Sequence, residues 1–197
     1  MASFYDESWD KLESIIDSEL TFKEGWQEII DFHAAKIPAG YWQQIREVNI
    51  QTDHEDILKW FQQIVVDHPL PKAVNAIWFG IVRLWDEDAE KEYYSLYISG
   101  FDGYNENDAD WAAEDPKYAP ENRYIIPDAL ETIEKITQSD DENFSFLDWI
   151  LPIAYCSLLL NDIIRSKLNK LSFLKFKETI HVTVGYDDGD FVNIQSI

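Results

Sequence analysis

The sequence is poor in cysteine and in glycine. Of its 197 residues, Cys156 is the one cysteine, and 7 are glycines. A single cysteine excludes an internal disulfide and any zinc site made of several cysteines. Seven glycines leave no glycine-rich loop of the kind that cradles a phosphate group. The start of the chain lacks the cationic opening and the apolar run of a secretory signal, so we expect a cytosolic protein.

Cationic side chains are also scarce. There are 16 Lys and Arg against 38 Asp and Glu, which gives a formal net charge of -22. This charge repels nucleic-acid phosphates and anionic lipid head groups, so we expect neither nucleic acid nor a membrane as the partner. Apolar side chains make up 46% of the residues and aromatic ones 15%, which is enough to fill a core and excludes intrinsic disorder.

The first seventy residues have helical periodicity. Apolar side chains recur at intervals of three and four over 9–16 and 26–34, which predicts two amphipathic helices. Thr52 and Glu55 have the spacing of a capping box and precede a third apolar stripe, so we expect a third helix to begin there. This helix should end near Asp67, because a proline follows two residues later.

Strand patterns come next along the chain. Residues 76–85 are rich in Ile, Val, Trp and Phe, and residues 93–101 alternate between an apolar face and a half-polar face rich in tyrosine. Further on, residues 179–185 and 191–194 flank Asp187-Asp188-Gly189, a strong signal for a hairpin turn. These patterns predict an antiparallel sheet covered on one face, with a C-terminal hairpin.

Two further helices complete the predicted fold. One runs from Pro127 to about Ile136, and a more buried one runs from about Asp148 to about Leu168, with Pro152 tolerated near its first turn. The apolar stretch at 144–160 contains an acid and a proline and is too short to cross a bilayer, which predicts a buried helix. We expect one α+β domain over residues 1–197, with a helical part at 1–70, a part of mixed sheet and helix at 74–197, and helices packed on one face of the sheet.

Charge is unevenly distributed. Between Asp86 and Glu121, twelve acids stand against Lys91 and Lys117, whereas residues 165–177 hold five cations and no acid. The segment 102–122 has no periodicity and mixes acids with aromatic residues, a combination typical of binding surfaces. We predict that this loop binds a basic protein partner through Asp102, Tyr104, Glu106, Asp108, Asp110, Trp111, Glu114, Asp115 and Tyr118. A purely solubilising role for the acids is the simpler alternative.

Catalytic and metal-binding motifs do not stand out. The oxygen ligands between Asp102 and Asp110 lack the glycine and the closing glutamate of a calcium loop, and the four histidines are too scattered for zinc. Cys156 lies in the most apolar stretch and is expected to be a core residue. Of the eight tryptophans, five lie on apolar stripes (Trp9, Trp26, Trp60, Trp78 and Trp149), with Trp111 the exception.

These observations predict a protein that is not an enzyme and that needs no metal or cofactor. The alternative is a carbohydrate-binding or glycoside-hydrolysing protein, which would use exposed aromatic side chains and paired carboxylates. An acidic protein that fills the cationic cleft of a partner gains association rate from opposite charges, and this favours the binding interpretation.

Several segments between roughly residues 77 and 197 together form a recognisable set. They are YSLYISG at 94–100, the acidic aromatic segment around Asp110 and Trp111, RYIIP at 123–127, the apolar helix and VGYDDGDF at 184–191. This set resembles the small acidic immunity proteins encoded beside bacterial polymorphic toxins. The resemblance implies a cytosolic, non-catalytic α+β protein that binds a toxin domain, often a nuclease, and occludes its active site.

Overall fold

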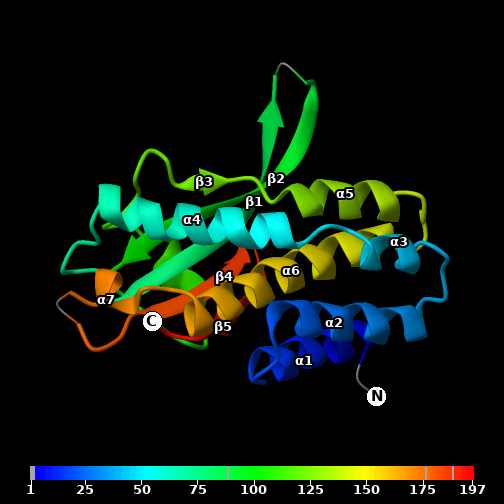
Figure 1. Ribbon diagram of the computed structural model, residues 1–197, viewed down its shortest axis with the longest axis horizontal. Helices are drawn as coiled ribbons and strands as arrows, with labels where there is room; N and C mark the ends of the chain where they lie inside the picture. The colour runs from blue at the N-terminus through cyan, green and yellow to red at the C-terminus, as the bar shows by residue number, and fades with distance from the viewer. Residues whose placement is uncertain (1–2, 88, 176, 188) are drawn as a thin grey trace.

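Helices pack across a twisted sheet, and a hairpin projects from the body (Figure 1). The structure is a computed structural model that describes residues 3–87, 89–175, 177–187 and 189–197. Asp88, counted among the acids above, and Asp188, of the predicted turn, lie outside the described residues. The α+β class predicted from the sequence is confirmed.

The N-terminal part is helical, as predicted. Its helices are α1 (Phe4–Ile16), α2 (Phe22–Lys36), α3 (Trp42–Arg46) and α4 (Gln51–Asp67). Complete capping boxes begin α1 at Ser3 and α2 at Thr21. In each box the hydroxyl accepts from the backbone amide three residues later, and the acidic side chain of that residue accepts from the backbone amide of the capping residue. The capping box predicted at Thr52 is wrong, since α4 begins one residue earlier and Thr52 lies inside the helix.

The sheet is mixed, with the strand order β3-β2-β1-β4-β5. Its strands are β1 (Ala76–Asp86), β2 (Lys91–Phe101), β3 (Tyr124–Ile125), β4 (His181–Tyr186) and β5 (Phe191–Ile194). Three of the pairings are antiparallel, but β4 runs parallel to β1, with Ala76 opposite His181. The expectation of a wholly antiparallel sheet is therefore wrong. Long helical connections let β4 return beside β1 in the same direction, which a short hairpin could not do.

The remaining helices are α5 (Asp128–Thr137), α6 (Phe144–Ser166) and α7 (Lys170–Phe173), together with the 3-10 helix η1 (Ala109–Ala113). By length and composition α6 could cross a membrane, but 89% of its most apolar window is buried inside the protein, as in the core helix of a soluble fold. Cys156 lies on α6 with 1% of its surface exposed, which confirms that it is a core residue. Burial also raises the pKa of its thiol.

Pro152 lies in the interior of α6 and not near its first turn, so that expectation is wrong. A proline in mid-helix leaves the carbonyl four residues earlier without an amide partner. Here that carbonyl belongs to Asp148, and the Tyr94 hydroxyl from β2 lies 3.2 Å from its oxygen. The sheet therefore supplies the polar partner that the helix lacks.

The main core lies between the helices and one face of the sheet. Phe79 of β1 meets Phe61 of α4 edge to face, with ring centroids 5.0 Å apart, so the 1–70 part and the 74–197 part share one continuous apolar cluster. A second, smaller cluster of Ala76, Trp78, Phe101 and Trp111 lies on the opposite face. Both faces are covered, one by helices and the other by the loop at 102–122, so the expectation of a sheet covered on one face is wrong.

Candidate functional site

Trp111 anchors the acidic loop, defined here as residues 102–122, to the sheet. Only 7% of Trp111 is exposed, and its ring meets Phe101 at 5.4 Å and Trp78 at 6.0 Å between centroids. Its indole nitrogen donates to the carbonyl of Asn105 at 3.2 Å. The expectation that Trp111 is the exposed tryptophan is wrong, because the second face of the sheet carries large rings of its own that need covering.

The other two aromatic residues of the acidic loop are also held by the protein. Tyr118 is buried, bridges to Gly100 of β2, and donates from its hydroxyl to the carbonyl of Ile64 at 3.3 Å. Burial raises the pKa of Tyr118. Tyr104 is half-buried and stacks flat on His181 of β4. Trp111 and Tyr118 therefore cannot offer their rings to a partner while the loop is docked.

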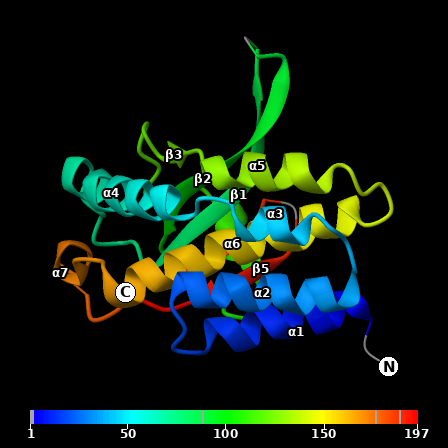
Figure 2. The ribbon, with the colours of Figure 1, turned by 45° about the vertical axis from the view of Figure 1, so that its right-hand side comes forward.

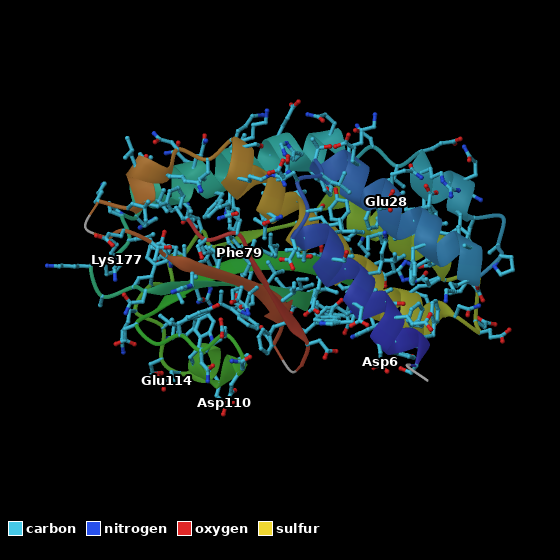
Figure 3. All side chains as sticks on the ribbon, turned by 90° about the horizontal axis from the view of Figure 1, so that it is seen from below. Asp6, Glu28, Phe79, Asp110, Glu114 and Lys177 are labelled. Atoms are coloured by element: carbon cyan, nitrogen blue, oxygen red, sulfur yellow. The ribbon has the colours of Figure 1, made fainter. Side chains whose placement is uncertain are left out.

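The acids of the loop point outward. The six predicted acids are all exposed, and Figure 3 shows Asp110 and Glu114 at the outer edge of the η1 segment: Asp102, Glu106, Asp108, Asp110, Glu114 and Asp115. Asp108 caps η1 by accepting from the amide of Asp110 at 2.9 Å, and Asp102 lies 3.7 Å from Lys117. The loop thus divides its residues, with the aromatic rings inward and the carboxylates toward solvent.

A recess of about 650 Å³ lies between η1 and the β4–β5 turn. It brings two of the predicted acids, Asp108 and Asp110, together with Asp187 from the turn. Its aromatic rings come from Trp78, Tyr97 and Phe191, whereas the hydroxyl of Tyr186, another lining residue, donates to the carbonyl of Trp149 on the helix side of the sheet. None of the described residues that line it is cationic, so its described lining combines three aspartates with aromatic residues and carries only negative formal charge.

Two glycines open the space that the rings occupy. Gly80 of β1 and Gly185 of β4 are direct neighbours in the parallel pairing. A Cβ on Gly80 would lie 2.1 Å from the ring of Tyr97, and one on Gly185 would lie 2.5 Å from the ring of Trp78. The Tyr97 hydroxyl donates to the carboxylate of Asp187, and its pKa is raised by burial and by this carboxylate. The recess is therefore built into the sheet.

A second exposed feature is the end of the β1–β2 hairpin, which we call the arm (residues 83–87 and 89–94). Figures 1 and 2 show it projecting from the body. Trp85 on the arm is 60% exposed, and its cross-strand neighbour is Glu92. At the base, the Arg83 guanidinium binds Glu134 at 2.7 Å and Asp148 at 2.6 Å, which fixes the arm to α5 and α6.

Neither the recess nor the arm is evident from the sequence, for different reasons. Trp85 ends an apolar strand pattern and looks like core, yet the strand continues beyond the helices that cover it. The recess joins residues from four segments, and only the tyrosine-rich face predicted for 93–101 signalled it. No group of three His, Cys, Asp or Glu within the described residues is arranged to hold a metal ion. No protein-family model, curated protein or solved structure matches the chain.

Proposed function

We propose that the protein is a non-catalytic binding protein that captures a basic protein domain on its acidic face. The observation that carries the proposal is the recess, whose described lining combines Asp108, Asp110 and Asp187 with aromatic rings and holds no cation. A lysine or arginine side chain of a partner would find carboxylates there and rings that exclude water, and charge pairs are stronger in such surroundings than in bulk water. The resemblance to immunity proteins supports a toxin domain as this partner and the cytosol as the place of action.

The acids outside the recess serve the approach of the partner. Exposed charges act over about 8 Å at physiological ionic strength, and a large net charge raises the rate of association with a basic surface. Asp102, Glu106, Glu114 and Asp115 surround the recess region on the same loop and would add to this attraction. In this proposal the loop carboxylates set the association rate, and the recess sets how long the partner stays.

The proposal is tested with the protein encoded by the neighbouring gene, using its C-terminal domain as the candidate partner. We expect the wild-type chain to form a complex and to restore growth of cells that express this domain. The variant Asp108→Asn/Asp110→Asn/Asp187→Asn should weaken binding by at least about tenfold, because three charge-assisted contacts lose their charge.

The matched control removes the same charge elsewhere. Asp10→Asn/Asp17→Asn/Asp141→Asn replaces three exposed aspartates outside the recess, and it should keep affinity within about twofold and keep protection. Equal binding by the two triple variants would show that the recess has no specific role. A complex without growth protection would support the binding protein but contradict the immunity function.

Carbohydrate binding is the second candidate, since the recess also combines rings with carboxylates. Sugars stack on the open face of an aromatic ring, but Trp78 is only 4% exposed and offers little area for this. A glycan array and a panel of glycosidase substrates separate the two functions. Saturable sugar binding that is insensitive to salt would favour this candidate, whereas binding to a protein that weakens with salt favours the first.

A further inference from the structure

A second cavity, of about 620 Å³, is lined by more cations than acids, in contrast to the acidic chain as a whole. It lies where α2, the start of α4 and the end of α6 meet, far along the chain from the acidic loop. Its cationic lining consists of Lys23, Arg46, Arg165 and Lys167, against Asp162 as the acid among the described lining residues. In a chain with a net charge of -22, this cavity uses the start of the cationic stretch at 165–177, which the proposed function leaves unexplained.

His54 and Asp162 form a buried pair in the wall of this cavity. His54 is 9% exposed, and its Nε2 lies 3.1 Å from the Oδ2 atom of Asp162. The hydrogen bond from His54 lowers the pKa of Asp162, so the carboxylate stays ionised and accepts from Nε2–H. Nδ1 of His54 has no partner within the described part of the chain, and in the tautomer that donates Nε2–H to Asp162 this nitrogen is an acceptor, so the ring reports on a ligand in the cavity without donating to its oxyanion.

Two of the four cations are available to a ligand. Arg46 pairs with Asp31 at 2.7 Å, and Arg165 donates to the carbonyl of Ser18 at 2.9 Å, so both arginines already hold the protein together. Lys23 and Lys167 are exposed at the cavity, and neither ammonium group has a partner within residues 3–87, 89–175, 177–187 and 189–197. The 17-residue α4 begins at the same cavity, and although Asn49 accepts from the Gln51 amide at 3.2 Å, the helix N-terminus adds partial positive charge there.

Part of the remaining lining is apolar, and it contains a further unpaired donor. Phe22, Trp26, Ile30 and Val48 supply rings and aliphatic surface. Trp26 is 3% exposed, and its indole N–H has no hydrogen-bond partner among the described residues. The volume falls in the range of roughly 300 to 1,000 Å³ that is usual for small-molecule sites, which combine apolar walls with a few placed polar groups.

We infer that this cavity binds a small organic anion, an apolar ring or chain that ends in a phosphate or a carboxylate. Lys23 and Lys167 contact the oxyanion beside the His54 ring, and the rings of Phe22 and Trp26 contact the apolar part. The site does not depend on the proposed function, because its residues, its charge and its ligand all differ from those of the recess.

The probes are phenyl phosphate, benzoate and uncharged phenol, titrated into the full chain and followed by calorimetry and by the imidazole ¹⁵N signals of His54. We expect saturable binding of a charged probe, a shift of the Nδ1 signal, and no saturable binding of phenol. Tighter binding of phenyl phosphate assigns a phosphate ligand, and tighter binding of benzoate assigns a carboxylate. The variant Lys23→Ala/Lys167→Ala should lower the affinity for the preferred probe by at least about tenfold, since each lysine contributes a charged contact.

The control variant is Lys72→Ala/Lys175→Ala, which removes two exposed lysines outside the cavity. It changes the net charge by the same amount, so it should alter the affinity by less than about twofold if the contacts are specific. Equal weakening by the two double variants would overturn the assignment and leave only general attraction. Absence of saturable binding by both charged probes up to millimolar concentrations would overturn it as well.

Discussion

The hydroxyl of Tyr94 lies 3.2 Å from the carbonyl oxygen of Asp148, the helical acceptor that Pro152 leaves without an amide partner. The same hydroxyl accepts from Arg83 at 2.8 Å, and its one proton is shared between this carbonyl and the carboxylate of Asp148, whose oxygen lies 2.6 Å away. One tyrosine of the sheet thus compensates the proline in the core helix and also joins the ion pairs at the base of the arm.

This relationship predicts coupling between Tyr94 and Pro152. Tyr94→Phe should lower the free energy of unfolding by about 1 to 3 kcal/mol, because polar groups of Asp148 and Arg83 lose a buried partner. In a Pro152→Ala background the restored amide donates to the carbonyl of Asp148. Tyr94→Phe should then lower the free energy of unfolding by about 1 kcal/mol less than it does in the wild type. Urea unfolding of the four proteins measures the difference. Strictly additive effects would show that the carbonyl contact contributes nothing.

Trp111 is predicted to determine stability and not affinity. Trp111→Ala removes a buried ring from between Trp78 and Phe101, and the free energy of unfolding should fall by about 3 to 5 kcal/mol. Urea denaturation measures this loss, and partner affinity is measured on the folded fraction. A folded Trp111→Ala protein of unchanged stability but weakened partner binding would contradict the docked position of the ring.

Trp85 is predicted to be the aromatic contact that Trp111 cannot be. If the proposed function holds, Trp85→Ala should reduce the binding free energy for the partner by about 2 kcal/mol, because an exposed tryptophan among acids is a typical anchor in an interface. The melting temperature should stay unchanged. Leu171→Ala, which alters an 82% exposed side chain elsewhere, is the control and should leave affinity unchanged. If the two variants bind equally well, the arm lies outside the interface.

His33 is predicted to make the fold sensitive to acid. It is buried among aromatic rings, and burial lowers its pKa to about 4 from the ordinary 6.5. A lowered histidine pKa means that the folded state resists protonation, so stability is complete above pH 6.5 and is lost as the pH falls toward 4. The maximum loss is about 3 kcal/mol.

The comparison protein for this prediction is His33→Phe, which keeps an aromatic ring but cannot titrate. Urea unfolding at about pH 7 and about pH 4 gives the change in stability for each protein, and the difference between them isolates His33 from the many carboxylates. The wild type should lose more stability than the variant. Parallel losses in both would mean that His33 does not contribute.

The helical part and the sheet part are predicted to unfold together. Asp53 on α4 accepts from the amides of Asp128 and Ala129 at 3.1 and 3.0 Å and from the Tyr155 hydroxyl at 2.8 Å, so it caps α5 from a distant segment. Calorimetry should show one transition. Asp53→Ala should lower the free energy of unfolding by about 3 kcal/mol and still give a single transition. Asp56→Ala, at an exposed position, should have little effect on either. Two separate transitions in the wild type would contradict this.

Local patterns were sufficient to predict most elements of the fold. The apolar spacing located α2, α4 and α5, and alternation located β1, β2 and β5, because these signals depend on residues close in sequence. Strand direction depends on how distant segments meet, and nothing within 179–185 indicates that β4 runs parallel to β1. Pro152 was misplaced for the same reason, since its tolerance depends on Tyr94 in another strand.

The candidate site was only half predictable. The acids of the loop are exposed because solvation keeps charged groups at the surface, and this holds wherever the chain runs. The exposure of an aromatic ring depends on whether it packs on another apolar surface. Trp111 is buried because it packs on Trp78 and Phe101 at the second face of the sheet. Asp187 entered the recess only because the turn between β4 and β5 lies beside η1.

The central place of β1 has a consequence while the chain is being made. Its first neighbour, β2, leaves the ribosome directly after it, but its other neighbour, β4, follows only after α5, α6 and α7. Until then one edge of β1 has unpaired amides and carbonyls, which invite pairing with other chains. The nascent protein therefore cannot complete its sheet during most of translation, and newly made chains at high concentration should depend on chaperones that cover this edge.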